Sequence, residues 1–336
     1  MRPRRDSLST LLRAEAVQVL ITGGAGFIGS NLADALVARG EEVVIYDNFS
    51  TGRRRFLEGL SEHPNATIVE GDILDEPALI RAMTDCDQVV HLAANADVRH
   101  GLERPRVDLE QNTIGTFTVL NAMRQVGVER ILFSSTGSVY GEPEVFPTPE
   151  TCPFPRQTSL YGASKLAGEG LIQAFCEGYG FAGIVCRFVS ILGERYTHGH
   201  LFDFHQSLLD DPTQLLVLGN GKQTKSYLYV GDCVQAMLRL IDHAKLGTCE
   251  AFNLGTDETT DVNESIGRVL EHMQITPTIT YTGDQRGWIG DSPLIHLDCA
   301  KLRALGWVPE STISEAVART LSWFDDNGWV FERAGG

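Results

Sequence analysis

Short apolar runs alternate with longer amphipathic segments through the first half of the chain, and this alternation constrains the fold more than any other feature of the sequence. Strands that are joined through helices need crossover connections, so the pattern predicts an α/β fold built on a Rossmann-type, doubly wound parallel sheet. The expected strands are residues 17–22, 43–46, 67–69, 88–93, 130–135 and 183–188. The expected helices are residues 26–39, 76–84, 106–126 and 159–179.

The pattern becomes less regular after residue 188 and indicates a smaller mixed α/β portion that binds the substrate and returns to the sheet at least once. There we expect strands at 215–218, 227–230, 251–254 and 278–281, and helices at 231–243, 261–273 and 312–326. The chain is therefore expected to have three parts: a flexible tail over 1–16, a Rossmann domain over 17–188 with a return of about 225–255, and a substrate-binding portion over 189–336.

Charge and cysteine content exclude several classes of protein. The 336 residues include 44 acidic and 28 basic side chains, a formal net charge of −16, which repels nucleic acids and anionic lipid surfaces. The seven cysteines form no Cys-x-x-Cys pair, which favours reduced thiols over a disulfide framework or a zinc site. No apolar segment is long enough to span a membrane. We therefore expect a cytoplasmic protein with neither nucleic acid nor membrane as a partner.

A glycine-rich turn, TGGAGFIG, follows the first expected strand. Gly23, Gly26 and Gly29 would let the backbone approach a pyrophosphate, whose charge the N-terminus of the next helix stabilises. Asp47 ends the second strand, where a carboxylate binds the adenosine ribose and repels the extra phosphate of NADP. The turn therefore predicts an NAD site, with a purely structural turn as the alternative.

Two later features leave alternatives open. The run Arg53-Arg54-Arg55 would bind the NADP phosphate or, as the favoured alternative, begin a solvated helix. Asp72 follows the third strand and would contact the adenine amino group or cap the next helix.

Tyr161 and Lys165 are four residues apart at the start of an expected helix, which places them on one face. An ammonium group and the positive ring of oxidised nicotinamide would both favour the phenolate, moving the tyrosine pKa down from about 10. Ser134, Ser135 and Thr136 end a strand at the edge where ligands bind, so their hydroxyl groups would face the nicotinamide. These residues predict hydride removal from an alcohol; an ordinary helix start and a Ser/Thr-rich turn are the structural alternatives.

The segments TGGAGFIGS, YDNFSTG, GDILD, HLAA, QNTIGT, FSSTGSVYGE and YGASK, in this order, resemble the extended short-chain dehydrogenase/reductase superfamily. Over about residues 17–330 the chain is most similar to sugar-nucleotide epimerases of the UDP-glucose (UDP-galactose) 4-epimerase type. The resemblance implies tightly held NAD, Thr136 as the partner of the substrate C4 hydroxyl, Tyr161 as base and acid, and Lys165 bound to the nicotinamide ribose. It also implies a nucleoside diphosphate sugar, UDP-linked, as substrate. The resemblance and the long helical stretches 106–126 and 159–179 predict a homodimer formed through helix packing, with a monomer as the alternative.

The turn and the resemblance together give two sets of site residues. The expected cofactor-binding residues are Gly23, Gly26, Phe27, Ile28, Gly29, Asp47, Asn48, Ser50, Thr51, Gly52, Asp72, Ile73, Leu92, Ala93, Ala94, Asn112, Ser134, Tyr161, Lys165 and Phe188. The expected substrate-binding residues are Thr136, Tyr161, Ser190, Lys225 and Arg286. Three of these depart from the family pattern: Ser190 stands where asparagine is usual, Lys225 replaces an arginine, and Arg286 lies in a motif two residues longer than the common one.

The turn after Thr136 discriminates among the reactions of the superfamily. Related dehydratases and uronate decarboxylases carry acidic residues there, whereas this chain has Gly137 and Ser138. Glu142 and Glu144 lie past the turn and are interpreted as a surface loop. A 4-epimerase that works through a transient 4-keto sugar is therefore favoured. The alternatives are a 4,6-dehydratase or uronate decarboxylase and, more distantly, a non-catalytic NAD sensor.

Two further groups of residues are candidates for a metal site and for the sugar pocket. One has metal-binding side chains within a short span, namely His198, His200, Asp203 and His205, but the expected reaction needs no metal and we predict none. The other should line the sugar pocket and comprises Ala96, Asp97, Val98 and Arg99. Arg99 would meet a carboxylate if the sugar were a uronic acid.

Overall fold

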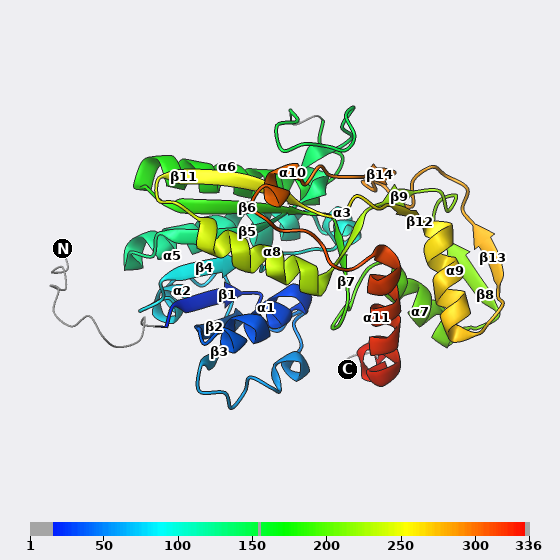
Figure 1. Cartoon of the computed structure of the whole chain (residues 1–336), viewed down its shortest axis with the longest axis horizontal. Coiled ribbons are helices and arrows are strands. Elements are labelled where there is room, and N and C mark those ends of the chain that lie inside the picture. The colour runs from blue at the N-terminus through cyan, green and yellow to red at the C-terminus, as the bar shows by residue number, and fades with distance from the viewer. Residues whose placement is uncertain (1–15, 154–155, 333–336) are drawn as a thin grey trace, which may run out of the picture.

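The computed structural model describes residues 16–153 and 156–332, and its main body is a seven-stranded parallel sheet (Figure 1). The strand order is β11-β6-β5-β4-β1-β2-β3, which confirms the predicted Rossmann-type α/β fold. The strands are β1 (Gln18–Thr22), β2 (Glu42–Asp47), β3 (Ala66–Glu70), β4 (Gln88–His91), β5 (Arg130–Thr136), β6 (Ala182–Phe188) and β11 (Thr248–Leu254). The order reverses between β1 and β4, and ligands bind at such a point in doubly wound sheets. The predicted tail, apart from residue 16, lies outside the described residues.

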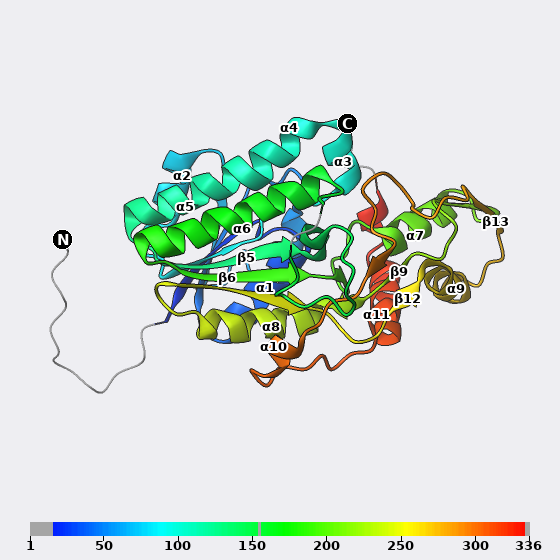
Figure 2. The same ribbon diagram turned by 90° about the horizontal axis from the view of Figure 1, so that it is seen from above.

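Helices cover both faces of the sheet, as Figure 2 shows from above. One face carries α2 (Glu76–Ala82), α5 (Gly115–Val126) and α6 (Leu160–Tyr179), and the other carries α1 (Phe27–Ala38) and α8 (Val230–His243). Leu20 packs into the buried cluster on the α5 side, whereas Ile21 packs into the cluster on the α1 side. The strands are apolar on both sides because both sides are covered.

The helix expected over residues 106–126 is not continuous. A short α4 (Pro105–Val107) leads into a π-helix, η2 (Asp108–Ile114), and the chain becomes α-helical again only in α5. Asn112 lies in the wider turn and is buried. Wider turns of this kind are frequent at functional sites, and helical periodicity in a sequence does not reveal them.

The chain leaves the sheet after β6 and comes back to it through α8 and β11, which pairs in parallel with β6. Small sheets form between β7 (Ser190–Leu192) and β10 (Tyr227–Tyr229), between β8 (Gln214–Val217) and β13 (Thr278–Tyr281), and among β12 (Thr260–Asp261), β9 (Thr224–Lys225) and β14 (Leu294–Ile295). The helices beside them are α7 (His200–Asp210), α9 (Val262–Met273) and α11 (Ile313–Asp326). Shorter helices are α3 (Val98–Glu103), α10 (Ala300–Arg303), η1 (Arg54–Leu57), η3 (Gly137–Tyr140) and η4 (Gly328–Phe331). The domain boundary at residue 188 stays a prediction.

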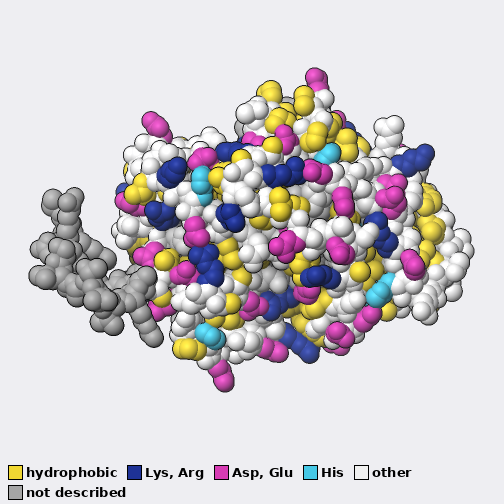
Figure 3. Space-filling view, viewed as in Figure 1, with side chains coloured by type: hydrophobic (Ala, Val, Ile, Leu, Met, Phe, Trp, Pro, Cys, Tyr) yellow, Lys and Arg dark blue, Asp and Glu magenta, His cyan; other side chains and the backbone are white. Residues whose placement is uncertain are grey.

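No helix among residues 16–153 and 156–332 has both the length and the hydropathy to cross a membrane. On the face drawn in Figure 3, acidic and basic side chains are interspersed rather than gathered by sign. This face therefore offers no broad positive surface, and an anionic ligand there would have to be held by local groups.

Candidate active site

The glycine turn lies between β1 and α1, beside the point where the strand order reverses. Gly23 has a φ of +69°, and a Cβ on it would lie 2.7 Å from the backbone nitrogen of Ala93. A Cβ on Gly29 would lie 2.3 Å from the carbonyl oxygen of Gly23. Gly26 is the N-cap of α1, and no side chain caps the first turn, where Phe27 and Ile28 supply N–H groups. The turn is thus a cradle that side chains would fill, with helix N–H groups open to an anion.

Asp47 ends β2 next to this cradle and is 8% exposed. Its carboxylate accepts hydrogen bonds from the backbone N–H groups of Ala25, at 2.9 Å, and Phe49, at 2.8 Å. Burial raises the pKa of Asp47, and the two hydrogen bonds oppose that shift. A Cβ on Gly52 would lie 2.7 Å from this carboxylate, so the loop that contains Ser50 and Thr51 closes directly over it.

Of the three arginines after Asp47, Arg53 donates its backbone N–H to the Ala25 carbonyl of the glycine turn, and the other two contact aromatic rings. The guanidinium of Arg54 stacks on the ring of Phe49 at 4.0 Å and pairs with Glu70, and that of Arg55 lies 4.5 Å from the ring of Trp329. Helix η1 begins at Arg54, as the solvated-helix alternative predicts.

Asp72 lies in the loop after β3 and accepts hydrogen bonds from the Leu74 N–H, at 2.9 Å, and the Asn48 side chain, at 3.1 Å. Asn48 in turn accepts the backbone N–H and the hydroxyl of Ser50. The alternative in which Asp72 caps α2 is wrong, because Asp75 is the N-cap of that helix.

Asn112 is the most constrained of the remaining predicted cofactor residues. Its amide donates to the Asn95 carbonyl, to Asp108 and to the Ser164 hydroxyl, and its oxygen accepts the Asn95 N–H at 2.8 Å. These bonds fasten the π-helix to α6 and to the loop after β4, so Asn112 positions other residues of the site. The other predicted positions lie at strand ends and in the loops that follow them: Ile73, Leu92, Ala93, Ala94 and Phe188.

The predicted catalytic residues meet at the end of β5 and the start of α6. Thr136 is the last residue of β5, and Tyr161 lies in the first turn of α6, where Ser159 is the N-cap. The Thr136 and Tyr161 hydroxyl groups are hydrogen bonded. Lys165 is 2% exposed, and its ammonium nitrogen lies 3.5 Å from the Ser134 hydroxyl. The structure therefore brings together Thr136, Tyr161, Lys165 and Ser134.

Burial shifts the pKa values of both Tyr161 and Lys165. Burial raises the pKa of Tyr161 to about 12, and the hydrogen bond with Thr136 only partly opposes that shift. Burial lowers the pKa of Lys165 to about 7, against the attraction of Glu169. The lowering of the Tyr161 pKa was expected from Lys165 together with oxidised nicotinamide and stays a prediction, whereas in the protein alone loss of solvent raises that pKa.

A buried polar network beneath the site was missed by sequence reasoning. Glu169, one helical turn after Lys165, accepts two hydrogen bonds from Arg187 of β6, at 3.0 and 2.7 Å. Glu169 also accepts the hydroxyl of Ser135 at 2.5 Å, so the expectation that Ser135 faces the nicotinamide is wrong. Arg187 then donates to the Tyr140 hydroxyl at 2.7 Å. A charged residue inside the apolar run GIVCRF was the signal for this network.

Both predicted substrate cations are ion-paired. The ammonium of Lys225 lies 2.6 Å from the Asp291 carboxylate, which is 2% exposed. Arg286 pairs with Glu142, so Glu142 is a partner of the site and not only part of a surface loop. A pocket of ≈ 440 Å³ lies around this second pair and is lined by Glu142, Arg156, Gln157, Thr158, Arg286, Ile289 and Gly290. Ser190 begins β7 and is paired in register with Tyr227 of β10, two residues after Lys225.

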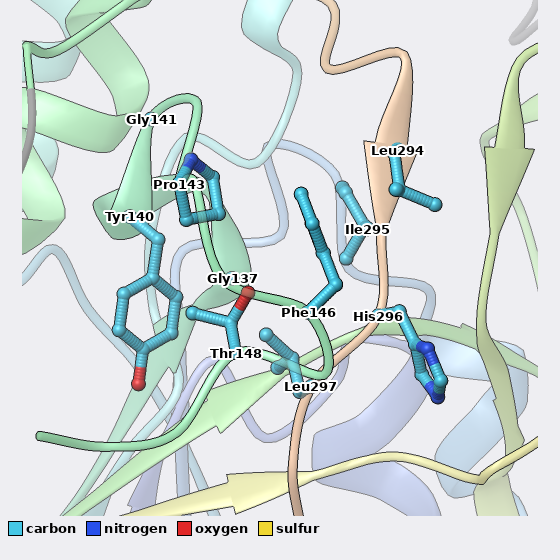
Figure 4. Close-up of a pocket in the computed structure, with 10 residues that line it drawn as sticks. All are labelled: Gly137, Tyr140, Gly141, Pro143, Phe146, Thr148, Leu294, Ile295, His296 and Leu297. Atoms are coloured by element: carbon cyan, nitrogen blue, oxygen red, sulfur yellow. The ribbon is translucent and has the colours of Figure 1, made fainter. Parts of the chain in front are cut away.

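Gly137, the residue after Thr136, lines a different pocket. Figure 4 shows this small pocket between η3 and the segment around β14, with Gly137, Phe146, Ile295 and Leu297 among its lining residues. A Cβ on Gly137 would lie 3.4 Å from Ile295 and 3.5 Å from Leu297. A side chain at position 137 would therefore start in ordinary van der Waals contact with aliphatic groups.

The four residues considered for a metal are engaged in other contacts. The His205 ring stacks on Phe331 at 4.8 Å, the His198 ring stacks on Tyr196 at 5.9 Å, the His200 ring lies 4.9 Å from that of Tyr227, and Asp203 pairs with Arg99 at 3.3 Å. Within the described part of the chain, no group of three or more metal-ligating side chains is arranged to hold an ion.

The model of the NAD dependent epimerase/dehydratase family matches residues 19–255. The chain belongs to this family. It is 31% identical over 318 residues to a UDP-glucose 4-epimerase of Mycolicibacterium smegmatis, a match that covers 92% of the chain and 98% of the relative. It is also 31% identical to UDP-glucuronic acid decarboxylase 1 of Arabidopsis thaliana, over 92% of the chain and 70% of the relative. The crystal structure of Thermus thermophilus UDP-glucose 4-epimerase in complex with NAD has a TM-score of 0.80 at 32% identity and covers 92% of the chain and 99% of that structure.

NAD is the cofactor of this epimerase/dehydratase family, and the site fits it. The cradle at Gly23 and Gly29 has room for a pyrophosphate beside the N-terminus of α1, and the Asp47 carboxylate lies next to it. Lys165 and Ser134 lie at the other end of the site, beside the catalytic hydroxyl groups. The role of each of these residues toward NAD stays a prediction.

Proposed function

We propose that this chain is a sugar-nucleotide 4-epimerase that interconverts UDP-glucose and UDP-galactose through a transient 4-keto sugar. The observation that carries the proposal is the turn after Thr136, where Gly137 and Ser138 supply no carboxylate. Elimination and decarboxylation continue from the same ketone but need further acid and base groups beside the sugar ring. A side chain at position 137 would contact Ile295 and Leu297, which are aliphatic and offer no polar partner to a carboxylate.

Tyr161 has the central role in the proposed mechanism. Its hydroxyl oxygen removes the proton from the substrate C4 hydroxyl and later returns it. Thr136 holds the Tyr161 hydroxyl through the hydrogen bond between the two side chains. Lys165 follows Tyr161 by one helical turn, and its ammonium form stabilises the phenolate when the two side chains share a single titrating proton. NAD, when bound, supplies the hydride acceptor and donor. The 4-keto sugar must turn over between the two transfers so that the configuration at C4 is inverted.

A neutral hexose fits the charges near the expected sugar pocket better than a uronic acid does. Arg99, which would meet a sugar carboxylate, already lies 3.3 Å from Asp203 and 3.5 Å from Asp97. One guanidinium between two carboxylates leaves a net negative group, which repels a third carboxylate. This arrangement supports glucose and galactose over glucuronate as the sugar.

The decisive experiment incubates the protein with a panel of sugar nucleotides, without added cofactor, and identifies the products by NMR. The proposal predicts conversion of UDP-glucose to UDP-galactose without net release of NADH. A stable keto sugar would instead indicate a dehydratase, and release of CO₂ from UDP-glucuronate would indicate a decarboxylase.

A substitution at Tyr161 tests the proposed proton transfer separately from NAD binding. Tyr161→Phe removes the proton-transferring hydroxyl and leaves the ring in place, so epimerisation should be lost while NAD content after purification is unchanged. Near-normal turnover of this variant would contradict the role of Tyr161.

The proposed assembly is a homodimer formed through η2, α5 and α6. Large apolar side chains are exposed along these helices, namely Leu109, Ile114, Phe117, Leu160 and Tyr179. Figure 2 shows α5 and α6 side by side on the outside of the sheet, where a second copy has access to both. Packing of the two helix pairs would bury these side chains. A cytoplasmic location stays a prediction.

A further inference from the structure

Two cysteine side chains from distant parts of the sequence meet beside Gly183. Cys176 lies near the end of α6, and Cys249 of β11 is directly paired with Gly183 of β6. A Cβ on Gly183 would lie 2.7 Å from the sulfur of Cys176 and 3.1 Å from the sulfur of Cys249. Both sulfur atoms therefore share the space that any larger residue at position 183 would occupy, and the two thiols interact through a hydrogen bond.

The two thiols differ in exposure and in acidity. Cys176 is 3% exposed, whereas Cys249 is half-buried. Hydrogen bonds from Cys249 and from the backbone N–H of Gly183 lower the pKa of Cys176, while the same contact and burial raise the pKa of Cys249. Lys301, whose ammonium lies 4.1 Å from the centre of the Phe252 ring, adds a positive charge near Cys249. Cys176 is therefore the thiol that ionises more easily, and Cys249 is the neighbour that reaches solvent.

A second pair of neighbouring cysteines lacks these properties. Cys186 of β6 and Cys233 of α8 interact, yet both are 0% exposed. Burial raises the pKa of each, and neither is open to a reagent in water. Thiols in such surroundings behave as small apolar side chains. This pair serves as an internal control for the first one.

We propose that Cys176 and Cys249 form a redox-active dithiol that hydrogen peroxide converts into a disulfide. The Cys176 thiolate attacks one peroxide oxygen, the O–O bond breaks, and the products are the Cys176 sulfenic acid and hydroxide. Hydroxide takes the proton of the Cys249 thiol and becomes the first water molecule. The Cys249 thiolate then attacks the sulfenic sulfur, and the remaining oxygen leaves as the second water with the proton that Cys176 released on ionising. The two thiols lose two electrons in total, and peroxide gains them.

The disulfide would join the end of α6 to the edge strand β11. Cys176 lies eleven residues after Lys165, about 16 Å along the helix, so the bond forms far from the catalytic side chains. It would anchor the helix that carries Tyr161 and Lys165 without contacting either residue. The inference is therefore independent of the proposed reaction, and its test does not use catalytic activity.

The test treats the folded full-length protein with a small excess of hydrogen peroxide, denatures it, counts free thiols with a chromogenic disulfide and maps the peptides by mass spectrometry. We expect two of the seven thiols to be lost, a peptide linked through Cys176 and Cys249, and full recovery with dithiothreitol. Cys249→Ser should prevent formation of any linked peptide, whereas the control variant Cys233→Ser should retain it.

Three outcomes would overturn the proposal: seven thiols that all survive, a link between other cysteines, or oxidation of Cys176 to a sulfinic acid without a link. The peptide map of the wild-type protein decides among these even if a serine variant does not fold. Thermal unfolding gives a second measurement, because the oxidised wild-type protein should unfold several degrees above the reduced one. An unchanged midpoint would contradict the anchoring of α6 to β11.

Discussion

The buried pair of Glu169 and Arg187 allows a quantitative test of how the catalytic helix is held. The side chains of Arg187 and Glu169 are 3% and 1% exposed, and Glu169 accepts two hydrogen bonds from Arg187 and one from Ser135. Glu169→Gln removes the negative charge, so the buried guanidinium of Arg187 loses its counter-charge. Breaking a buried ion pair on one side costs about 3–5 kcal/mol, so the free energy of unfolding should fall by that amount.

Urea denaturation followed by circular dichroism measures this loss of unfolding free energy. Two matched variants serve as controls. Asp242→Asn removes the partner of Arg39 in a pair whose side chains are 60% and 36% exposed, and it should cost less than about 1 kcal/mol. The double variant Glu169→Gln/Arg187→Met removes both buried charges and should recover most of the lost stability. A Glu169→Gln loss as small as that of Asp242→Asn would refute the reasoning.

The catalytic pair, the glycine cradle and the exposed helix face each give a further prediction. Because the pKa of Lys165 is about 7 and that of Tyr161 about 12, the pair binds a second proton below pH 7 and has no base there. The value of kcat should therefore fall as pH drops through this range, and a flat profile would contradict the assignment. Gly29→Ala should abolish NAD binding, measured as cofactor content after purification, because its Cβ would meet a carbonyl oxygen at 2.3 Å, whereas Gly267→Ala, with nothing within 4 Å, should retain it. Phe117→Glu should convert the proposed dimer into a monomer in light scattering, since it puts a charge on the packed face, and a dimer that persists would place the interface elsewhere.

The sheet and its helices were predictable because each strand is a short apolar run and each helix is a longer amphipathic segment. The strand expected at 183–188 is Ala182–Phe188, and the helix expected at 159–179 is Leu160–Tyr179. Helix α7 (His200–Asp210) was not predicted. Its buried residues Leu201, His205 and Leu208 have helical spacing, but its histidines and aspartate also match the residue types of a metal site. The π-helix η2 was not predicted either, because its residue types and their spacing do not distinguish it from an α-helix in the sequence.

The candidate site was also predictable only in part. Local sequence was sufficient for the glycine turn, for Asp47 and for the meeting of Thr136 with Tyr161, since each lies at a strand end or helix start. The partners of Lys225 and Arg286 were not predictable, because Asp291 and Glu142 are 66 and 144 residues away. The pKa of Tyr161 depends on how completely the folded chain excludes water, which no spacing of residues reports.

The ion pairs at Lys225 and Arg286 have a consequence for the kinetics of ligand capture. Each of these cations is already neutralised by a carboxylate, and the chain as a whole has a net charge of −16. An approaching nucleoside diphosphate sugar is therefore repelled at long range and attracted only when it displaces Asp291 or Glu142. At 0.1 M salt this long-range repulsion is largely screened beyond about 10 Å. The association rate constant should thus increase with ionic strength, the opposite of what an enzyme with a positively charged funnel for anions would do.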